Sequence, residues 1–285
     1  MLTYFQAIIL GLLQGITELF PISSLGHSVV LPSLLEWNIN QSEPFFLTFL
    51  VATHTATALV LFFYFLNDWK RIFKGIVRSL KEREIKESDA DAKLGWLLVV
   101  ATIPAGILGI LFETTFQKLF GNPQLVAGML ILNGLLLFAA ELLRRKRKEQ
   151  TAAHSNERIA KVTWSQAVKI GLLQCIALIP GFSRTGATLT GGLLFGLSHE
   201  DSARFAFLLA TPIIGAASIL KLPELAGATE RSVLIPVIIG AVTAGIAAYF
   251  SVRFLTKYFE TKTLTPFAIY CTVIGVILSV IFFIR

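Results

Sequence analysis

The chain has 285 residues, of which 54% are hydrophobic and 15% are charged, and its formal net charge is +7. An average soluble domain carries about 25% charged residues, so this composition, with a mean hydropathy of +0.71, excludes a disordered chain, a disulfide-rich secreted domain and an ordinary soluble enzyme. The positive charge does not indicate a nucleic-acid partner, because most Lys and Arg residues fall in short polar stretches between apolar runs, as in a polytopic membrane protein.

Six apolar runs are long enough to cross a bilayer. A spanning helix needs about 20 predominantly apolar residues. The runs are 45–66, 93–113, 124–143, 202–220, 232–252 and 265–284. We therefore expect an all-α membrane protein with about six full transmembrane spans, surrounded by membrane lipids.

Two further apolar regions are each interrupted by a break that contains proline. Their halves are 4–20 and 24–37, then 164–179 and 184–197. Each half is too short to span comfortably, and such pairs in corresponding places are typical of re-entrant or broken helices around a binding site. Irregular backbone in a bilayer is stable only where protein or water satisfies it. We expect two re-entrant helix hairpins.

The two broken regions also align with each other at an offset of 160 positions. Gly-Leu-Leu-Gln at 11–14 recurs at 171–174, and Ser23 recurs as Ser183. Three full spans lie in each copy, and an odd number of spans turns the second copy over. The sequence thus predicts an inverted-topology repeat whose two breaks meet near the middle of the membrane.

The basic residues predict the orientation. The stretches 67–92 and 144–163 are rich in Lys and Arg, and such loops lie on the cytoplasmic side. The first broken pair then enters from outside and the second from inside. We expect one membrane domain over 1–285, with repeat one at about 1–143, repeat two at about 164–285, and the basic cytoplasmic loop 144–163 between them.

The first break carries polar side chains that are costly in a membrane and usually functional. Gln14 and Glu18 are four residues apart and share one helix face. Ser23, Ser24 and His27 follow the break. We expect these five residues to form one half of a polar site.

The second break carries groups suited to an anion. Gln174 precedes it, and the next helix opens with Ser183, Arg184, Thr185, Gly186 and Thr188. Free N–H groups at a helix start bind anions, and the planar fork of Arg binds two phosphate oxygens at once. The alternatives are structural: Arg184 could pair with Glu18, and the hydroxyls could satisfy the broken backbone.

Other ionisable residues favour structural interpretations. His54 lies within the first full span but outside both breaks. Glu113, Glu141 and His199 lie near the ends of apolar runs, and we expect them to be solvated.

Two segments carry a family resemblance. QGITELFPISSLGH at 14–27 resembles the first signature of the bacterial undecaprenyl pyrophosphate phosphatases, the bacitracin-resistance membrane family, and PGFSRTGAT at 180–188 resembles the second. The resemblance covers the whole chain. It implies hydrolysis of a polyprenyl diphosphate to the monophosphate and inorganic phosphate, which recycles the lipid carrier for cell-wall synthesis. It also implies a bacterial cytoplasmic-membrane enzyme with an active site open to the outer side, and a divalent cation, Mg²⁺ or Ca²⁺.

The chain departs from the family pattern at two positions. The family often has an acid where this chain has Gln14, and usually Ser or Thr where it has Leu25. The first departure weakens a two-carboxylate metal site. The second removes one hydroxyl, so that position cannot supply a nucleophile here.

In the expected mechanism the second break binds the substrate and the first break supplies the reacting groups. Arg184 and the groups that follow the second break hold the diphosphate, because phosphoryl transfer depends mainly on positioning and charge neutralisation. Glu18, with Gln14, binds the cation or orients a nucleophile. His27 acts as general acid or base, and Ser24 is the expected nucleophile, with Ser23 or activated water as alternatives.

Two other functions remain open. Inverted repeats with broken helices are also transporter architecture, so the chain could flip a polyprenyl phosphate. A phosphatidate-type lipid phosphatase is disfavoured, since it needs a second histidine motif that is missing downstream of Arg184. The sequence leaves the oligomeric state open, with a homodimer as one possibility.

Overall fold

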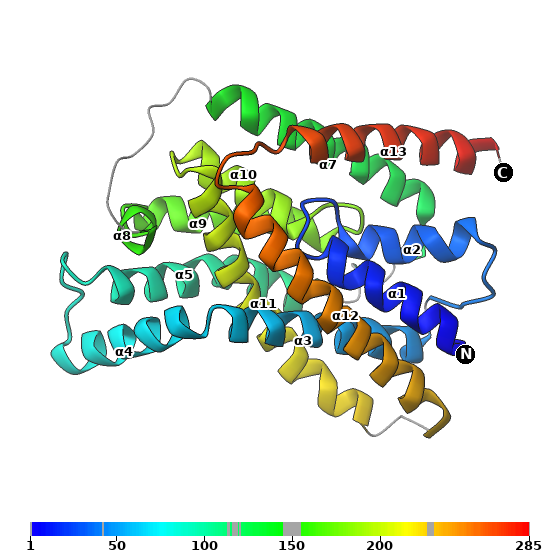
Figure 1. The fold of residues 1–285 in the computed structure, drawn as a ribbon, viewed down its shortest axis with the longest axis horizontal. Coiled ribbons are helices and arrows are strands. Elements are labelled where there is room, and N and C mark those ends of the chain that lie inside the picture. The colour runs from blue at the N-terminus through cyan, green and yellow to red at the C-terminus, as the bar shows by residue number, and fades with distance from the viewer. Residues whose placement is uncertain are drawn as a thin grey trace.

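The computed structural model describes residues 2–41, 43–112, 115, 119, 121–144, 155–226 and 231–284. Within these ranges the secondary structure is helical and contains no strand (Figure 1). The first half contains α1 (Tyr4–Thr17), α2 (Ser24–Leu34), α3 (Pro44–Tyr64), α4 (Leu66–Glu82), α5 (Ala90–Leu111) and α7 (Pro123–Arg144). The second contains α8 (Ser155–Ala160), α9 (Trp164–Gln174), the 3₁₀ turn η1 (Cys175–Leu178), α10 (Arg184–Leu194), α11 (His199–Ala226), α12 (Arg231–Tyr258) and α13 (Thr265–Ile284).

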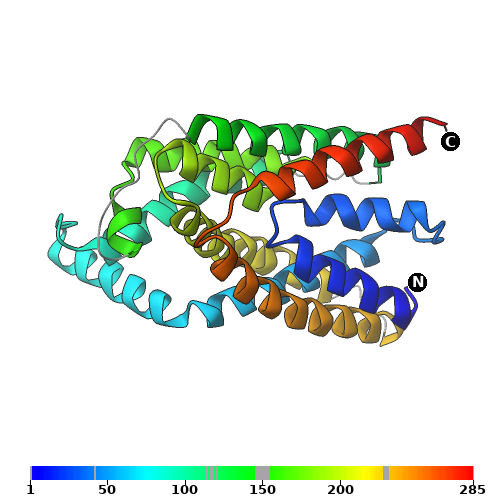
Figure 2. The same ribbon diagram turned by 45° about the horizontal axis from the view of Figure 1, so that its top comes forward.

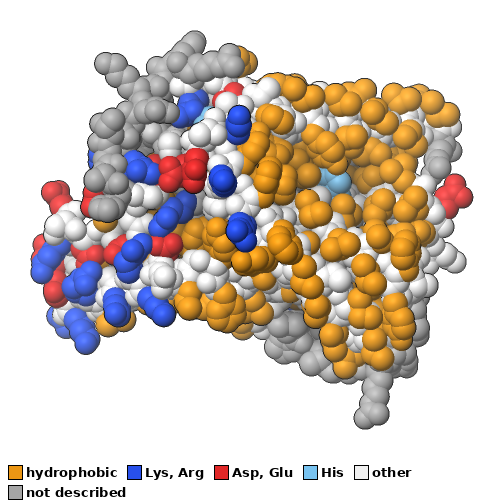
Figure 3. Space-filling view, viewed as in Figure 1, with side chains coloured by type: hydrophobic (Ala, Val, Ile, Leu, Met, Phe, Trp, Pro, Cys, Tyr) orange, Lys and Arg blue, Asp and Glu red, His pale blue; other side chains and the backbone are white. Residues whose placement is uncertain are grey.

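Six of the described helices are long and apolar enough to cross a membrane. They are α3, α5, α7, α11, α12 and α13, and they coincide with the six predicted runs. Their outer faces expose large apolar side chains, among them Ile110, Phe250 and Val280. Figure 3 shows such side chains as a broad hydrophobic band over one face. The chain is a multi-pass membrane protein.

Both predicted breaks are present, and the helices before them begin with the same cap. Thr3 and Gln6 form a capping box at the start of α1, and Thr163 and Gln166 form one at the start of α9. In each box the threonine hydroxyl and the glutamine side chain accept one backbone N–H from the other residue. The internal sequence similarity therefore extends to local structure.

Glycines let the two short helices pack closely against long ones. α1 lies along α12, and α9 lies along α5. A Cβ atom on Gly11 would lie 2.4 Å from the Gly240 carbonyl oxygen, and one on Gly171 would lie 2.4 Å from that of Ala101. α7 and α13 also pack side by side, as Figures 1 and 2 both show.

The stretch 67–92, which the sequence analysis treats as a loop, is largely the helix α4. This helix forms because the spacing of its residues is amphipathic: Trp69, Ile72 and Gly75 are buried, while Lys70 and Lys74 are exposed. The buried side packs on α5. Charged side chains gather at this end of the molecule, where α4, the start of α5 and α8 lie (Figures 1 and 3). Residues 145–154 of the second basic stretch lie outside the described residues.

The prediction of solvated Glu141 and His199 is wrong. Both side chains are buried, and their Oε1 and Nε2 atoms are 2.6 Å apart. The same Oε1 accepts the Leu264 N–H at 2.6 Å, and Arg144 contacts the other ring nitrogen of His199 at 2.8 Å. These contacts join α7, α11 and the start of α13. The packing of the three helices buries side chains that are distant in sequence, so they are not solvated. Glu113 lies outside the described residues.

Candidate active site

The two breaks meet at a cavity of about 320 Å³. From the first break and its flanks, its lining includes Thr17, Glu18, Ser23, Ser24 and Leu25. From the second, it includes Ala177, Leu178, Phe182, Ser183 and Arg184. Helices α3 and α11 complete it with Leu47, Leu50, Val51, His54, Ile213, Ile214, Ala217 and Ser218. The cavity is thus polar where the breaks meet and mostly apolar between α3 and α11.

Glu18 lies at the centre of the polar side. Its buried carboxylate accepts a hydrogen bond from Arg184 Nη2 on Oε1 at 2.8 Å. Its Oε2 accepts from Ser24 Oγ at 2.5 Å and from Gln14 Nε2 at 3.2 Å. His54 Nε2 lies 3.2 Å from the same oxygen. One carboxylate therefore connects a hydroxyl, a guanidinium and an imidazole from three separate segments.

The serines at the breaks start the two short helices. Ser23 Oγ accepts the Gly26 N–H at 3.2 Å, and Ser183 Oγ accepts the Gly186 N–H at 3.0 Å. The first amides of a helix have no acceptor within the helix, and a helix start carries partial positive charge. Because Ser24 and Arg184 line the cavity, α2 and α10 both direct their positive ends toward it.

Asn133, in the middle of α7, holds the two breaks together. Its Nδ2 donates to the Pro21 carbonyl at 2.9 Å, and its Oδ1 accepts the Ser183 N–H at 3.1 Å. Thr185 Oγ1 adds a bond to the Glu18 carbonyl at 2.9 Å. Asn133, which is fully buried, was not among the predicted site residues, although an amide in the middle of the apolar run 124–143 is a signal for such a role.

The positions of the two histidines differ from those that the sequence suggested. His27 does not line the cavity; its Nδ1 lies 2.6 Å from the Ser23 carbonyl oxygen, and its Nε2 lies 2.8 Å from the Tyr270 hydroxyl. His54, for which we expected a structural role, lines the cavity beside Glu18. The contact depends on how α3 packs against the first break, which the sequence pattern does not indicate.

Several residues predicted to bind substrate make hydrogen bonds within the protein. Thr188 Oγ1 donates to the Arg184 carbonyl at 3.0 Å, within α10. Gln174 Nε2 donates to the Ala101 carbonyl at 2.9 Å and ties α9 to α5. The side chains of Gln14, Gln174, Thr185 and Thr188 are buried outside the cavity lining. The Gly186 N–H serves the cap of α10.

One guanidinium nitrogen of Arg184 lacks a hydrogen-bond partner among the described residues. Arg184 uses Nη2 for Glu18, while its buried Nη1 has no hydrogen-bond partner among the described residues. An unpaired buried charged donor is costly. Arg184 also lines the cavity, whose apolar walls would suit a hydrocarbon group.

The described residues do not form a cation site of their own. No three His, Cys, Asp or Glu side chains gather in the described part of the chain. Glu18 is the one carboxylate among the described lining residues, and Arg184 already pairs with it. Gln14 Oε1 is buried and lacks a partner there, but Gln14 does not line the cavity.

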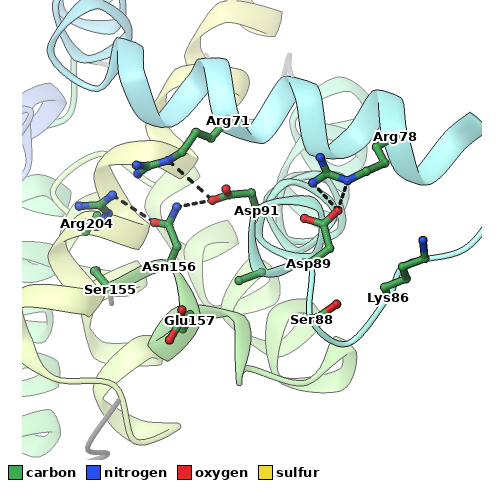
Figure 4. A pocket seen from close by; sticks show the side chains of 11 residues that line it. Arg71, Arg78, Lys86, Ser88, Asp89, Asp91, Ser155, Asn156, Glu157 and Arg204 are labelled. Carbon is green, nitrogen blue, oxygen red and sulfur yellow. Dashed lines mark hydrogen bonds and ion pairs between the residues drawn. The ribbon is translucent and has the colours of Figure 1, made fainter. Parts of the chain in front are cut away.

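A second, larger cavity of about 680 Å³ lies at the charged end (Figure 4). Its arginines are already paired: Arg78 with Asp89 at 2.5 Å, and Arg204 with Asp68 at 2.6 Å. Asn156 donates to Asp91 at 2.5 Å and accepts from Arg204 at 3.1 Å. These contacts dock α8 onto α5 and α11.

Comparisons with known proteins identify the family of the chain. A family model described as "Bacitracin resistance protein BacA" matches residues 7–277. The chain is 42% identical to "Undecaprenyl-diphosphatase 2" of Frankia alni over 99% of this chain and 98% of the relative. It is 43% identical to "Undecaprenyl-diphosphatase" of Mycolicibacterium paratuberculosis over 96% of this chain and 95% of the relative. A match of this length and identity, together with the two sequence signatures at one cavity, shows that the chain belongs to the BacA family of bacitracin resistance proteins.

Proposed function

We propose that the chain hydrolyses undecaprenyl diphosphate to undecaprenyl phosphate and inorganic phosphate. The observation that carries this proposal is the contact between Ser24, Glu18 and Arg184 at the junction of the breaks. The relatives are named as undecaprenyl-diphosphatases. Their names lend no support to the flippase alternative.

Ser24 is the nucleophile, and Glu18 is its base. A hydroxyl that already donates to a carboxylate, which other groups orient in turn, is the arrangement of an activated nucleophile. Glu18 takes the Ser24 proton as Oγ attacks the terminal phosphorus. The phosphoanhydride bond breaks, undecaprenyl phosphate leaves, and phosphoserine remains. Water then attacks the phosphoserine, protonated Glu18 returns its proton to the departing Ser24 oxygen, and both protons of the water leave with the inorganic phosphate.

Arg184 neutralises the charge that develops on the transferred phosphoryl group. Its guanidinium, at the cavity wall, provides the first contact, and the amides at the starts of α2 and α10 provide others. His54 balances the Glu18 charge beside it. Glu18 thus takes the acid–base role that the sequence analysis assigned to His27. The apolar walls from α3 and α11 take the first part of the isoprenoid tail.

Glu18 would hold a divalent cation together with the phosphates of the substrate. Mg²⁺ commonly binds one or two carboxylates together with substrate phosphates, and Glu18 can supply that carboxylate. When bound, the cation would neutralise phosphate charge. EDTA should then lower phosphate release, and Glu18→Gln should abolish the response to added Mg²⁺.

The architecture is an inverted repeat with two re-entrant hairpins. Support comes from the matching caps of α1 and α9, and from the way each short helix packs on a long helix of the other half. The protein lies in the bacterial cytoplasmic membrane with its charged end in the cytoplasm, and the cavity opens to the outer side. A homodimer stays a prediction.

The decisive experiment measures phosphate release from undecaprenyl diphosphate by purified protein in detergent. Arg184→Ala, Glu18→Gln and Ser24→Ala should each lower kcat/KM at least ~100-fold, the size of effect seen when one transition-state donor is removed. Ser279→Ala is the control, because its hydroxyl bonds only within α13. Acid quenching with terminally labelled substrate should trap label on wild type but not on Ser24→Ala.

Two outcomes would overturn the mechanism. Phosphate release by Arg184→Ala equal to wild type would show that Arg184 does not hold the diphosphate. Phosphate release by Ser24→Ala near the wild-type rate would replace the serine nucleophile with water.

A further inference from the structure

Ser23 adopts a backbone conformation that other contacts must hold. Its φ is +71°, one of three positive φ values among the described non-glycine residues. Such backbone conformations are strained and persist only where their surroundings enforce them. Ser23 directly precedes Ser24, so its backbone sets the direction in which the Ser24 hydroxyl points.

The Ser23 carbonyl is held by a chain of hydrogen bonds from α13. Its oxygen can only accept, so the His27 Nδ1 atom 2.6 Å away carries the proton. In a neutral ring the other nitrogen, Nε2, then accepts, and the Tyr270 hydroxyl at 2.8 Å donates to it. The Tyr270 and His27 rings are also stacked, with centroids 5.8 Å apart and planes 13° from parallel. The direction of donation is therefore Tyr270 to His27 to Ser23.

We propose that Tyr270 is a positioning residue for the phosphatase reaction. By donating to His27 Nε2 it fixes the ring's tautomer and orientation, so that Nδ1–H holds the Ser23 carbonyl. The strained backbone then keeps Ser24 Oγ against Glu18 Oε2. The inference rests on the proposed function, and it gives His27 a part that acts through Ser23 rather than on the substrate.

The test is Tyr270→Phe, which removes the donor and keeps the stacked ring. Because misplacing a reacting group by about 1 Å can cost ~100-fold in rate, we expect kcat to fall about 10- to 100-fold. KM should stay within twofold, because Arg184 and the apolar walls are unchanged. The matched control is Tyr249→Phe on α12, where the tyrosine is 45% exposed against 38% for Tyr270; its kcat should equal that of wild type.

A double-mutant cycle separates positioning from a general loss of stability. In a His27→Gln background, adding Tyr270→Phe should lower kcat no further, since both changes break one chain of contacts. The rate of phosphoenzyme formation should fall with kcat in Tyr270→Phe, while the melting temperature stays at the control's value.

The kinetic results distinguish failure of the Tyr270 role from failure of the proposed phosphatase function. No phosphate release by folded wild-type protein would overturn the proposed function and this inference together. An active wild type with Tyr270→Phe kinetics equal to Tyr249→Phe would overturn the inference alone. So would multiplicative losses in the cycle, or a lower melting temperature with kcat unchanged.

Discussion

At the scale of single residues, Glu141 and His199 show a polar contact that stabilises the fold apart from the cavity. Glu141→Ala should destabilise the protein by about 3 kcal/mol, because it leaves a buried histidine and the Leu264 N–H without their acceptor. The melting temperature in detergent measures this, and kcat of the folded fraction should stay at the wild-type value. Glu200→Ala is the control, since that side chain is 48% exposed and its contact with Arg158 is 3.4 Å long. A fall in kcat without a change in melting temperature would contradict this assignment.

At the scale of elements, the close packing of α9 on α5 tests how the second break is held. Gly171→Ala places a Cβ atom 2.4 Å from the Ala101 carbonyl oxygen, and overpacking of this kind costs about 1–3 kcal/mol. We expect a lower melting temperature and lower phosphate release, because α9 leads into the break that carries Arg184. Gly106→Ala on α5 is the matched control, as no described atom beyond its own stretch of helix lies within 4 Å of its added Cβ. Equal melting temperatures for the two variants would show that α9 can move away at no cost.

At the scale of the whole molecule, the gathering of charge at one end predicts the orientation in the membrane. In a Cys175→Ser background, Asn38→Cys should react with a membrane-impermeant thiol reagent on intact cells. Ser88→Cys should react only after permeabilisation, because it lies between α4 and α5 at the charged end. Both sites are exposed, and the remaining Cys271 is buried, so Cys175→Ser alone should stay unlabelled. The reverse pattern would place the charged end outside.

The sequence by itself determined the helical class, the six spans, the two breaks and the identity of the polar residues beside them. These features are local: a span follows from the length of an apolar run, and a break follows from proline and a serine that caps the next helix. It also indicated that Glu18, Ser24 and Arg184 belong to one site, because two breaks related by an internal repeat carried them.

The tertiary structure decided which of these groups meet and which only support. His54 contacts Glu18 because α3 packs beside the first break. His27 lies outside the cavity lining and contacts Tyr270 on α13 instead. Asn133 joins two breaks that lie far from it in the chain. Such contacts depend on the packing of whole helices, so no local pattern of hydropathy or capping specifies them.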